Sequence, residues 1–90
     1  MTEEKVKKEL RKLRSIIIVE QAGLKAEDPN GLIHKYEKAA KRLDPLNQTI
    51  YTEKIVNGKT YKQIGLSFHY SKEWVRKKWK KIISTLAELL

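Results

Sequence analysis

The sequence predicts an all-α fold: a small helical domain with a C-terminal helix-turn-helix and an N-terminal amphipathic helix. Three observations predict it. Apolar residues recur at steps of three and four along most of the chain, no segment alternates apolar and polar residues as a strand does, and helix-capping residues precede the last two helices. A chain of 90 residues can bury one modest core and has little room for a deep catalytic cleft, so we do not expect an enzyme.

The charge of the chain predicts an anionic partner. There are 20 Lys and Arg residues against 11 Asp and Glu, a formal net charge of +9, which favours nucleic acid, anionic lipid or an acidic protein as partner. Cysteine is absent, so no disulfide or thiolate metal site can form. The longest apolar run, Ile16 to Val19, is far too short for a membrane span. We therefore expect a cytoplasmic protein without a membrane partner.

The first predicted helix runs from about Thr2 to Ala22. It is amphipathic, because its other residues are mostly Lys, Arg and Glu. Its apolar residues are Val6, Leu10, Leu13 and Ile17. A lone helix would leave this stripe in water, so we expect the stripe to pack on the rest of the domain, with homodimer formation as a further option.

A second helix follows the turn signals Gly23 and Asp28–Gly31. Its apolar residues are Ile33, Tyr36, Ala40 and Leu43. The Asp44-Pro45 pair ends this helix, because the residue before a proline avoids the α region. Residues 1–45 therefore read as an N-terminal helical segment, which supports the domain or dimerises, and residues 46–90 as a second domain, whose motif is described next.

Three helices are predicted in the second half. The first covers Leu46 to Val56 and ends at Asn57-Gly58, two residues that tolerate positive φ. The second starts at a capping box, in which the Thr60 hydroxyl and the Gln63 side chain satisfy each other's backbone amides. The third starts at Ser71, a good N-cap. The apolar stripe of this last helix is Val75, Trp79, Ile82, Leu86 and Leu90.

The last two helices meet across residues 68–70. Gly65 stands where the first of them would cross the second, and a residue without Cβ lets the two backbones approach closely. This is the layout of a helix-turn-helix.

The stretch SKEWVRKKWKK, residues 71–81, carries most of the positive charge of the second half. Six Lys or Arg residues and one acid, Glu73, lie between residues 72 and 81, mainly opposite the apolar stripe. A DNA major groove admits such a helix, with cations meeting phosphates or guanine and the carboxylate accepting from a cytosine amino group. The alternatives are a basic face that is only solvated, and a Glu73 that only favours the helix start.

Residues 60–76, TYKQIGLSFHYSKEWVR, resemble the helix-turn-helix of sigma factor region four, and the resemblance extends over about residues 46–85. Within that group the chain is similar to short phage and mobile-element regulators of the ArpU type. The resemblance implies a core of Ile64, Gly65, Phe68, Tyr70 and Val75. His69 stands where a glycine is common, which histidine tolerates because it can enter the left-handed region. Nothing in the chain resembles the other sigma regions.

The resemblance also implies the function, a sequence-specific transcriptional regulator that binds double-stranded DNA in a bacterial or phage-infected cell. The caps Thr60 and Ser71 frame a DNA-facing set that starts with Lys72 and Glu73. The full set of expected DNA-binding residues is Thr60, Ser71, Lys72, Glu73, Trp74, Arg76, Lys77, Lys80 and Lys81. We expect Trp79 in the core and Trp74 beside the groove-facing side, where it packs on a neighbouring element or stacks on a base.

Two other function classes stay open. The chain could be a protein-interaction module that docks on RNA polymerase or another partner, or an accessory DNA-binding subunit of a terminase or recombination complex. No cofactor is expected, since no Gly-rich phosphate loop or catalytic triad is present. His34 and His69 have no ligand spacing around them, so no metal site is expected either.

Overall fold

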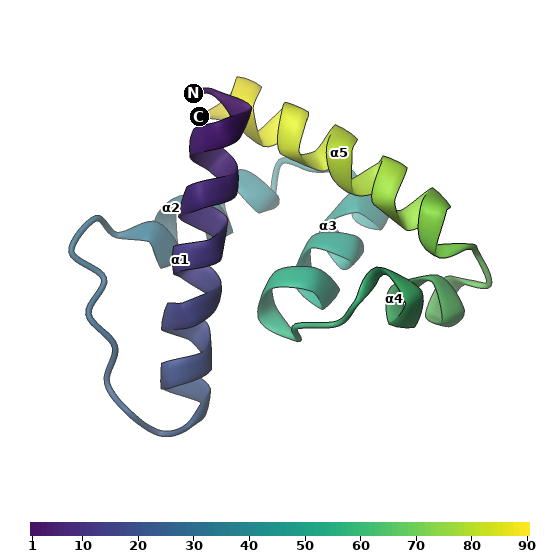
Figure 1. Ribbon diagram of the computed structural model, residues 1–90. Coiled ribbons are helices and arrows are strands. Elements are labelled where there is room, and N and C mark those ends of the chain that lie inside the picture. The colour runs from purple at the N-terminus through teal and green to yellow at the C-terminus, as the bar shows by residue number, and fades with distance from the viewer.

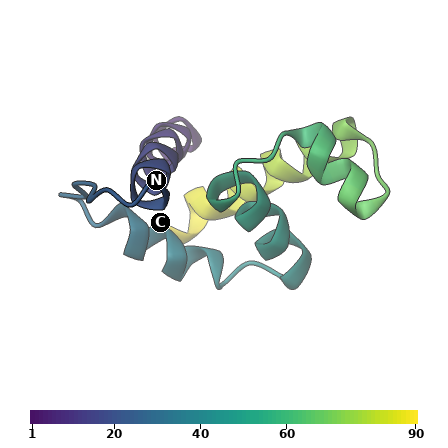
Figure 2. The same ribbon diagram turned by 90° about the horizontal axis from the view of Figure 1, so that it is seen from below.

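The computed structural model describes all 90 residues as helices joined by turns, with no strand. In chain order the elements are α1 (Glu3–Gln21), α2 (Leu32–Ala40), α3 (Pro45–Tyr51), the π-helical turn η1 (Thr52–Val56), α4 (Tyr61–Phe68) and α5 (Lys72–Leu89). The all-α prediction is confirmed. Figures 1 and 2 show α4 and the start of α5 at one end of the molecule and the loop between α1 and α2 at the other.

One hydrophobic core joins the two halves of the chain. The buried residues come from every helix and belong to a single cluster. The stripe of α1 lies in this core as Val6, Leu10, Leu13 and Ile16, while Ile17 is half-buried. Within one chain, α1 therefore packs on the rest of the domain. The division into residues 1–45 and 46–90 and the formation of a homodimer stay predictions.

The contact between α1 and α2 is completed by polar groups. The Tyr36 hydroxyl donates a hydrogen bond of 2.8 Å to the Glu9 carboxylate, and the Lys35 ammonium donates one of 3.0 Å to the same oxygen. Burial alone would raise the pKa of the Glu9 carboxyl, but these hydrogen bonds and the Lys35 charge lower it below its ordinary value. The buried tyrosine of α2 therefore has its hydroxyl satisfied at the edge of the core.

Of the two middle helices, the first ends earlier than predicted and the second ends at the predicted residue. α2 stops at Ala40 rather than at Asp44, and the turn that follows still buries Leu43. Asp44 instead caps the next helix, where its carboxylate accepts from the Asn47 amide at 2.9 Å. The predicted third helix spans nearly the predicted residues, but its last five residues form the π-helical turn η1, which no sequence signal indicated.

Arg14 ties α1 to this π-helical turn. Its guanidinium donates hydrogen bonds of 3.1 Å and 3.0 Å to the carbonyls of Ile55 and Val56, and Gln21 donates a further one to Val56. The end of a helix leaves carbonyl groups without intrahelical donors. The side chains of α1 therefore cap the turn and fix its position relative to the first helix.

The helix-turn-helix arrangement depends on Gly65. The Tyr70 amide donates to the Gly65 carbonyl at 2.8 Å, and a Cβ on Gly65 would lie only 2.6 Å from the Tyr70 carbonyl oxygen. His69, between them, adopts the left-handed region with φ of 60°, as expected from the resemblance. The two helices can thus approach as closely as the sequence predicts.

The expected core of this motif is correct except at one residue. Ile64, Gly65 and Val75 are buried and Phe68 packs partly against the core, but Tyr70 is 54% exposed. The left-handed His69 turns the chain away from the core. The Tyr70 ring then stacks on Trp74 outside it, with ring centroids 4.0 Å apart.

We expect Gly65→Ala to lower the free energy of unfolding by about 1–3 kcal/mol, because the clash is with backbone that cannot move without opening the turn. Urea unfolding followed by circular dichroism measures the change. Ser67→Ala, an exposed substitution in the same helix, serves as the control and should change the value by less than about 0.5 kcal/mol. Equal stabilities for the two variants would contradict the close-approach argument.

We expect Leu13→Ala, at a residue 2% exposed, to destabilise the whole chain by about 2–5 kcal/mol, because it leaves a cavity in the shared core. Both tryptophans lie on α5, so their fluorescence reports unfolding of the other half of the chain. The fluorescence midpoint should shift together with the circular dichroism midpoint, and the exposed control Lys12→Ala should leave both in place. A fluorescence midpoint that stays at the wild-type value would mean that α1 unfolds as a separate unit.

Candidate nucleic-acid interface

Helix α5 has one buried and one charged side. Val75, Ile82, Ile83 and Leu86 face the core. The predicted contact residues of the helix are exposed on its other sides, with Trp74 half-buried. They are Lys72, Glu73, Arg76, Lys77, Lys80 and Lys81. The structure therefore brings these six residues onto the accessible surface of one helix.

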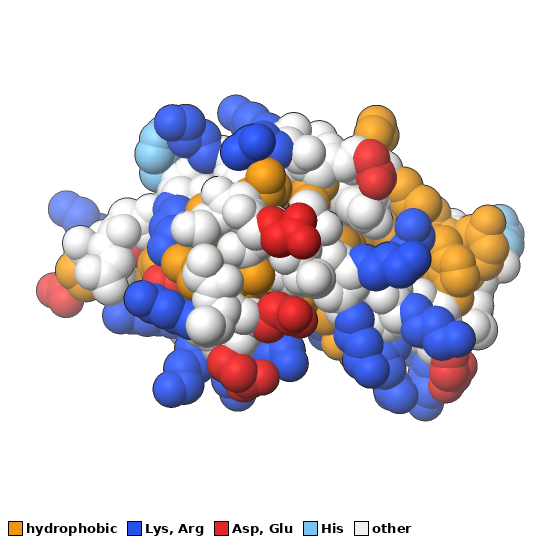
Figure 3. Space-filling view, turned by 90° about the horizontal axis from the view of Figure 1, so that it is seen from above, with side chains coloured by type: hydrophobic (Ala, Val, Ile, Leu, Met, Phe, Trp, Pro, Cys, Tyr) orange, Lys and Arg blue, Asp and Glu red, His pale blue; other side chains and the backbone are white.

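The cations of α5 have no carboxylate partners. The three ion pairs of the molecule are Lys7–Glu4, Lys35–Glu9 and Lys59–Glu53, and none involves α5. Glu73 is likewise unpaired and lies in the first turn of the helix, where the helix dipole favours an acid. Figure 3 shows Lys and Arg side chains gathered over the end of the molecule that holds α4 and the start of α5. This surface can attract an anion without first breaking an ion pair.

Thr60 and Ser71 use their hydroxyls as helix caps. The Thr60 hydroxyl accepts from the Gln63 amide at 3.2 Å, while the Gln63 side chain accepts from the Thr60 amide at 2.9 Å. The Ser71 hydroxyl accepts from the Trp74 amide at 3.1 Å. Both predicted caps are confirmed. Contact of either residue with DNA stays a prediction.

Trp74 packs against its own neighbours. Its ring stacks on Tyr70 at an interplanar angle of 13°, and the Lys78 ammonium lies 5.7 Å from its centroid. Leu66, on α4, is 69% exposed. Figure 3 shows apolar side chains beside the basic ones at this end of the molecule. The charged surface of α5 is therefore bordered by an apolar one.

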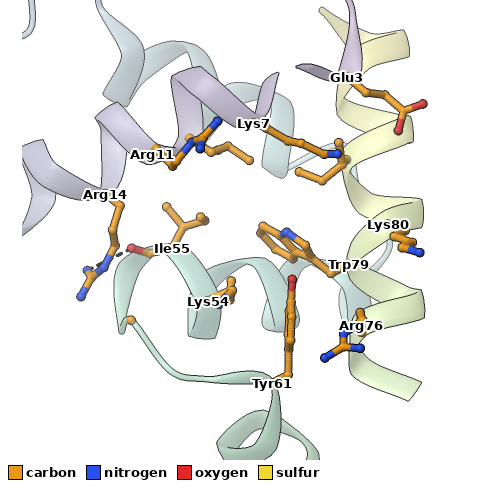
Figure 4. A pocket seen from close by; sticks show the side chains of 13 residues that line it. Glu3, Lys7, Arg11, Arg14, Lys54, Ile55, Tyr61, Arg76, Trp79 and Lys80 are labelled. Atoms are coloured by element: carbon orange, nitrogen blue, oxygen red, sulfur yellow. Dashed lines mark hydrogen bonds between the residues drawn. The ribbon is translucent and has the colours of Figure 1, made fainter. Parts of the chain in front are cut away.

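Arg76 and Lys80 stand on the side of α5 that faces α1. Between these two helices lies a groove of about 790 Å³, which Figure 4 shows from close by. We call it the basic groove. It is lined by Glu3, Lys7, Leu10, Arg11, Arg14, Lys54, Ile55, Gly58, Tyr61, Arg76, Trp79, Lys80 and Ile83. Six of these residues are cations and one is an acid.

Two cations of the groove lie near the ring of Tyr61. The Lys54 ammonium lies 4.5 Å from the Tyr61 centroid and the Arg76 guanidinium lies 5.8 Å from it. Burial, and then the charge of Arg14, lower the pKa of Lys54 below its ordinary value. The ring face offers partial compensation to these charges, but no carboxylate pairs with them.

Trp79 differs from its predicted place. It packs against the core and on Tyr51, with centroids 6.3 Å apart, but it is only half-buried and lines the basic groove. The reason is that α1 crosses α5 near the C-terminal end of α5 and leaves the flank of α5 at Trp79 uncovered (Figure 1). Figure 4 shows the Trp79 and Tyr61 rings between the α1 cations and the α5 cations.

Sequence reasoning missed the contribution of α1 to this surface. Lys7, Arg11 and Arg14 follow one another at steps of four and three, so they share one face of a helix. That spacing is visible in the sequence. What the sequence does not contain is the crossing of α1 and α5, which brings this face opposite Arg76 and Lys80.

Neither a metal site nor a membrane span is found. No three His, Cys, Asp or Glu side chains lie close enough together to hold a metal ion. No helix combines the length and the apolar character needed to cross a bilayer.

Comparison of the chain with protein-family models, with curated proteins and with solved structures finds no match.

Proposed function

We propose that this chain is a sequence-specific DNA-binding protein that regulates transcription, with α5 as the helix that enters the major groove. One observation carries the proposal: residues 72–81 of α5 present five exposed cations and one exposed carboxylate, none of them ion-paired, within a helix-turn-helix arrangement. The resemblance of residues 60–76 to sigma factor region four supports the same reading and favours a regulator of phage or mobile-element type.

The roles within this surface follow from chemistry. Lys and Arg contribute affinity, because contacts to phosphates release condensed counterions whatever the sequence. A carboxylate is repelled by phosphates, so a purely non-specific binder would do better without Glu73. Lys72 and Glu73, in the first turn of α5, are therefore the proposed base-reading pair.

The test of the proposal is the selection of bound sites from a pool of random duplexes at physiological salt. A DNA-binding regulator should enrich one sequence motif, with affinity well above that for random DNA. Retention of random DNA without an enriched motif would reduce the proposal to non-specific binding. No retention at all would remove it.

A second candidate function is docking on a protein such as RNA polymerase. It is favoured by Leu66 and Tyr70, two exposed side chains of the helix-turn-helix, since apolar side chains add nothing to phosphate contacts. In that case Leu66→Ser should abolish retention of polymerase and leave duplex affinity unchanged.

We expect Lys77→Ala with Lys80→Ala to weaken binding to all duplexes to a similar extent. Each lost phosphate contact should reduce the steepness of the fall of log affinity with log salt by about 0.9, so the pair should reduce it by about 1.8. Fluorescence anisotropy at several salt concentrations measures the slope. The control is Lys38→Ala with Lys41→Ala, two exposed lysines of α2 and the turn after it. An unchanged slope in the α5 variant would contradict the assignment.

We expect Glu73→Ala to keep or raise affinity for random DNA and to lose preference at one base pair, by about 1–3 kcal/mol. The measurement is a binding matrix over all single-base variants of the selected site. Lys72→Ala should weaken binding at an adjacent position of the same matrix. If the Glu73→Ala matrix matches that of the wild type everywhere, the carboxylate only favours the helix start, and specificity lies elsewhere on α5.

A further inference from the structure

The basic groove has two cationic walls that face each other. One wall is formed by Lys7, Arg11 and Arg14 on α1, and the other by Arg76 and Lys80 on α5. Figure 4 shows the two walls on either side of Trp79 and Tyr61, with Lys54 between them. A compact anion needs cations that converge on one point. Cations spread along two opposed walls suit an elongated anion that lies along the groove.

The floor of the groove is apolar. The buried side chains of Leu10 and Ile83 line the groove. Figure 4 shows the Trp79 and Tyr61 rings between the two walls. A polyanion that matches this floor must carry apolar atoms between its charges. The sugar–phosphate backbone of a nucleic acid does so, because each deoxyribose separates two phosphates.

The cations of the groove outnumber its carboxylates by six to one. Glu3 is the one carboxylate in the lining, and it forms no ion pair. Lys7 pairs only with Glu4 outside the groove, at 3.5 Å and with both side chains largely exposed, an interaction of little strength. No ion pair within the groove relieves the repulsion among its cations, and an anion bound between the walls would relieve it.

We propose that the basic groove binds the sugar–phosphate backbone of one strand of the duplex held by α5, so that α1 is a second DNA-contacting element. The proposal rests on the proposed function. Arg76 and Lys80 connect the groove to the DNA-binding role proposed for α5, because they line the groove and also stand on the exposed sides of α5. A backbone bordering the major groove that α5 occupies can therefore continue into the space beside α1.

The test compares two double variants of α1 with the same change of charge. Lys7→Gln with Arg11→Gln removes cations from the groove, whereas Lys8→Gln with Lys12→Gln removes cations from another side of the same helix. All four side chains are exposed, so neither variant should unfold the chain. Arg14 is left intact because it caps the π-helical turn.

Binding to the selected duplex is measured against salt, and contacted phosphates are mapped by ethylation interference. The groove variant should make the fall of log affinity with log salt less steep by about 1.8. It should also lose interference at a set of phosphates beside the α5 contacts, while those contacts stay. The control variant should retain the complete interference pattern.

Two results would overturn the proposal, and they differ. If the wild type binds the selected duplex and both variants give the same slope and the same interference pattern, the groove does not hold DNA and the role of α5 stands. If the wild type binds no duplex, the proposed function fails and the groove assignment fails with it. An acidic protein segment would then be the occupant to seek for the groove.

Discussion

Helix α5 is the element on which the rest of the structure depends, because α1, α2, α3 and α4 all pack against it. Its buried residues Val75, Ile82 and Leu86 supply the surface that the other helices cover. Burial of apolar side chains is the largest favourable contribution to folding, so this contact also fixes how α5 is rotated about its axis. Once Val75 and Leu86 face inward, Lys77 must face outward. The core therefore decides which way the charged residues point.

Local signals predicted much of this arrangement. Capping at Thr60 and Ser71 depends on residues three positions apart, and the left-handed conformation of His69 depends on the short connection between α4 and α5. Both can therefore be predicted from a few neighbouring residues. The need for a residue without Cβ at Gly65 could also be predicted, since two helices joined by so short a turn must approach closely. These features belong to single turns of the chain, where sequence distance and spatial distance coincide.

Features that depend on the crossing of distant helices could not be predicted in the same way. The apolar stripe of α5 suggests a buried Trp79, but the indole is half-exposed because α1 leaves one flank of α5 open. Tyr70 was expected in the core, but its ring is exposed and stacks on Trp74 outside the core. The π-helical turn depends in part on capping from Arg14, more than forty positions away in the chain, and the basic groove exists only once α1 and α5 are packed.

The concentration of charge has an energetic cost that the fold tolerates. Cations of α1, η1 and α5 lie around one groove that holds a single carboxylate, Glu3. The lowered pKa of Lys54 follows from burial and from the neighbouring Arg14. Natural proteins keep such unfavourable arrangements mainly at functional sites. The hydrogen bonds from Arg14 to two carbonyls show that one of these charges also has a structural role.

The two tryptophans of α5 lie in different surroundings although they are five residues apart in the chain. Trp79 lines the space between α1 and α5, while Trp74 is stacked on Tyr70 near the turn. The molecule thus carries two intrinsic fluorophores, one at each candidate contact surface. With either indole replaced by phenylalanine, quenching by a dissolved anion such as iodide would report on the remaining one alone, and emission from Trp79 would follow the filling of the space beside α1 without any added label.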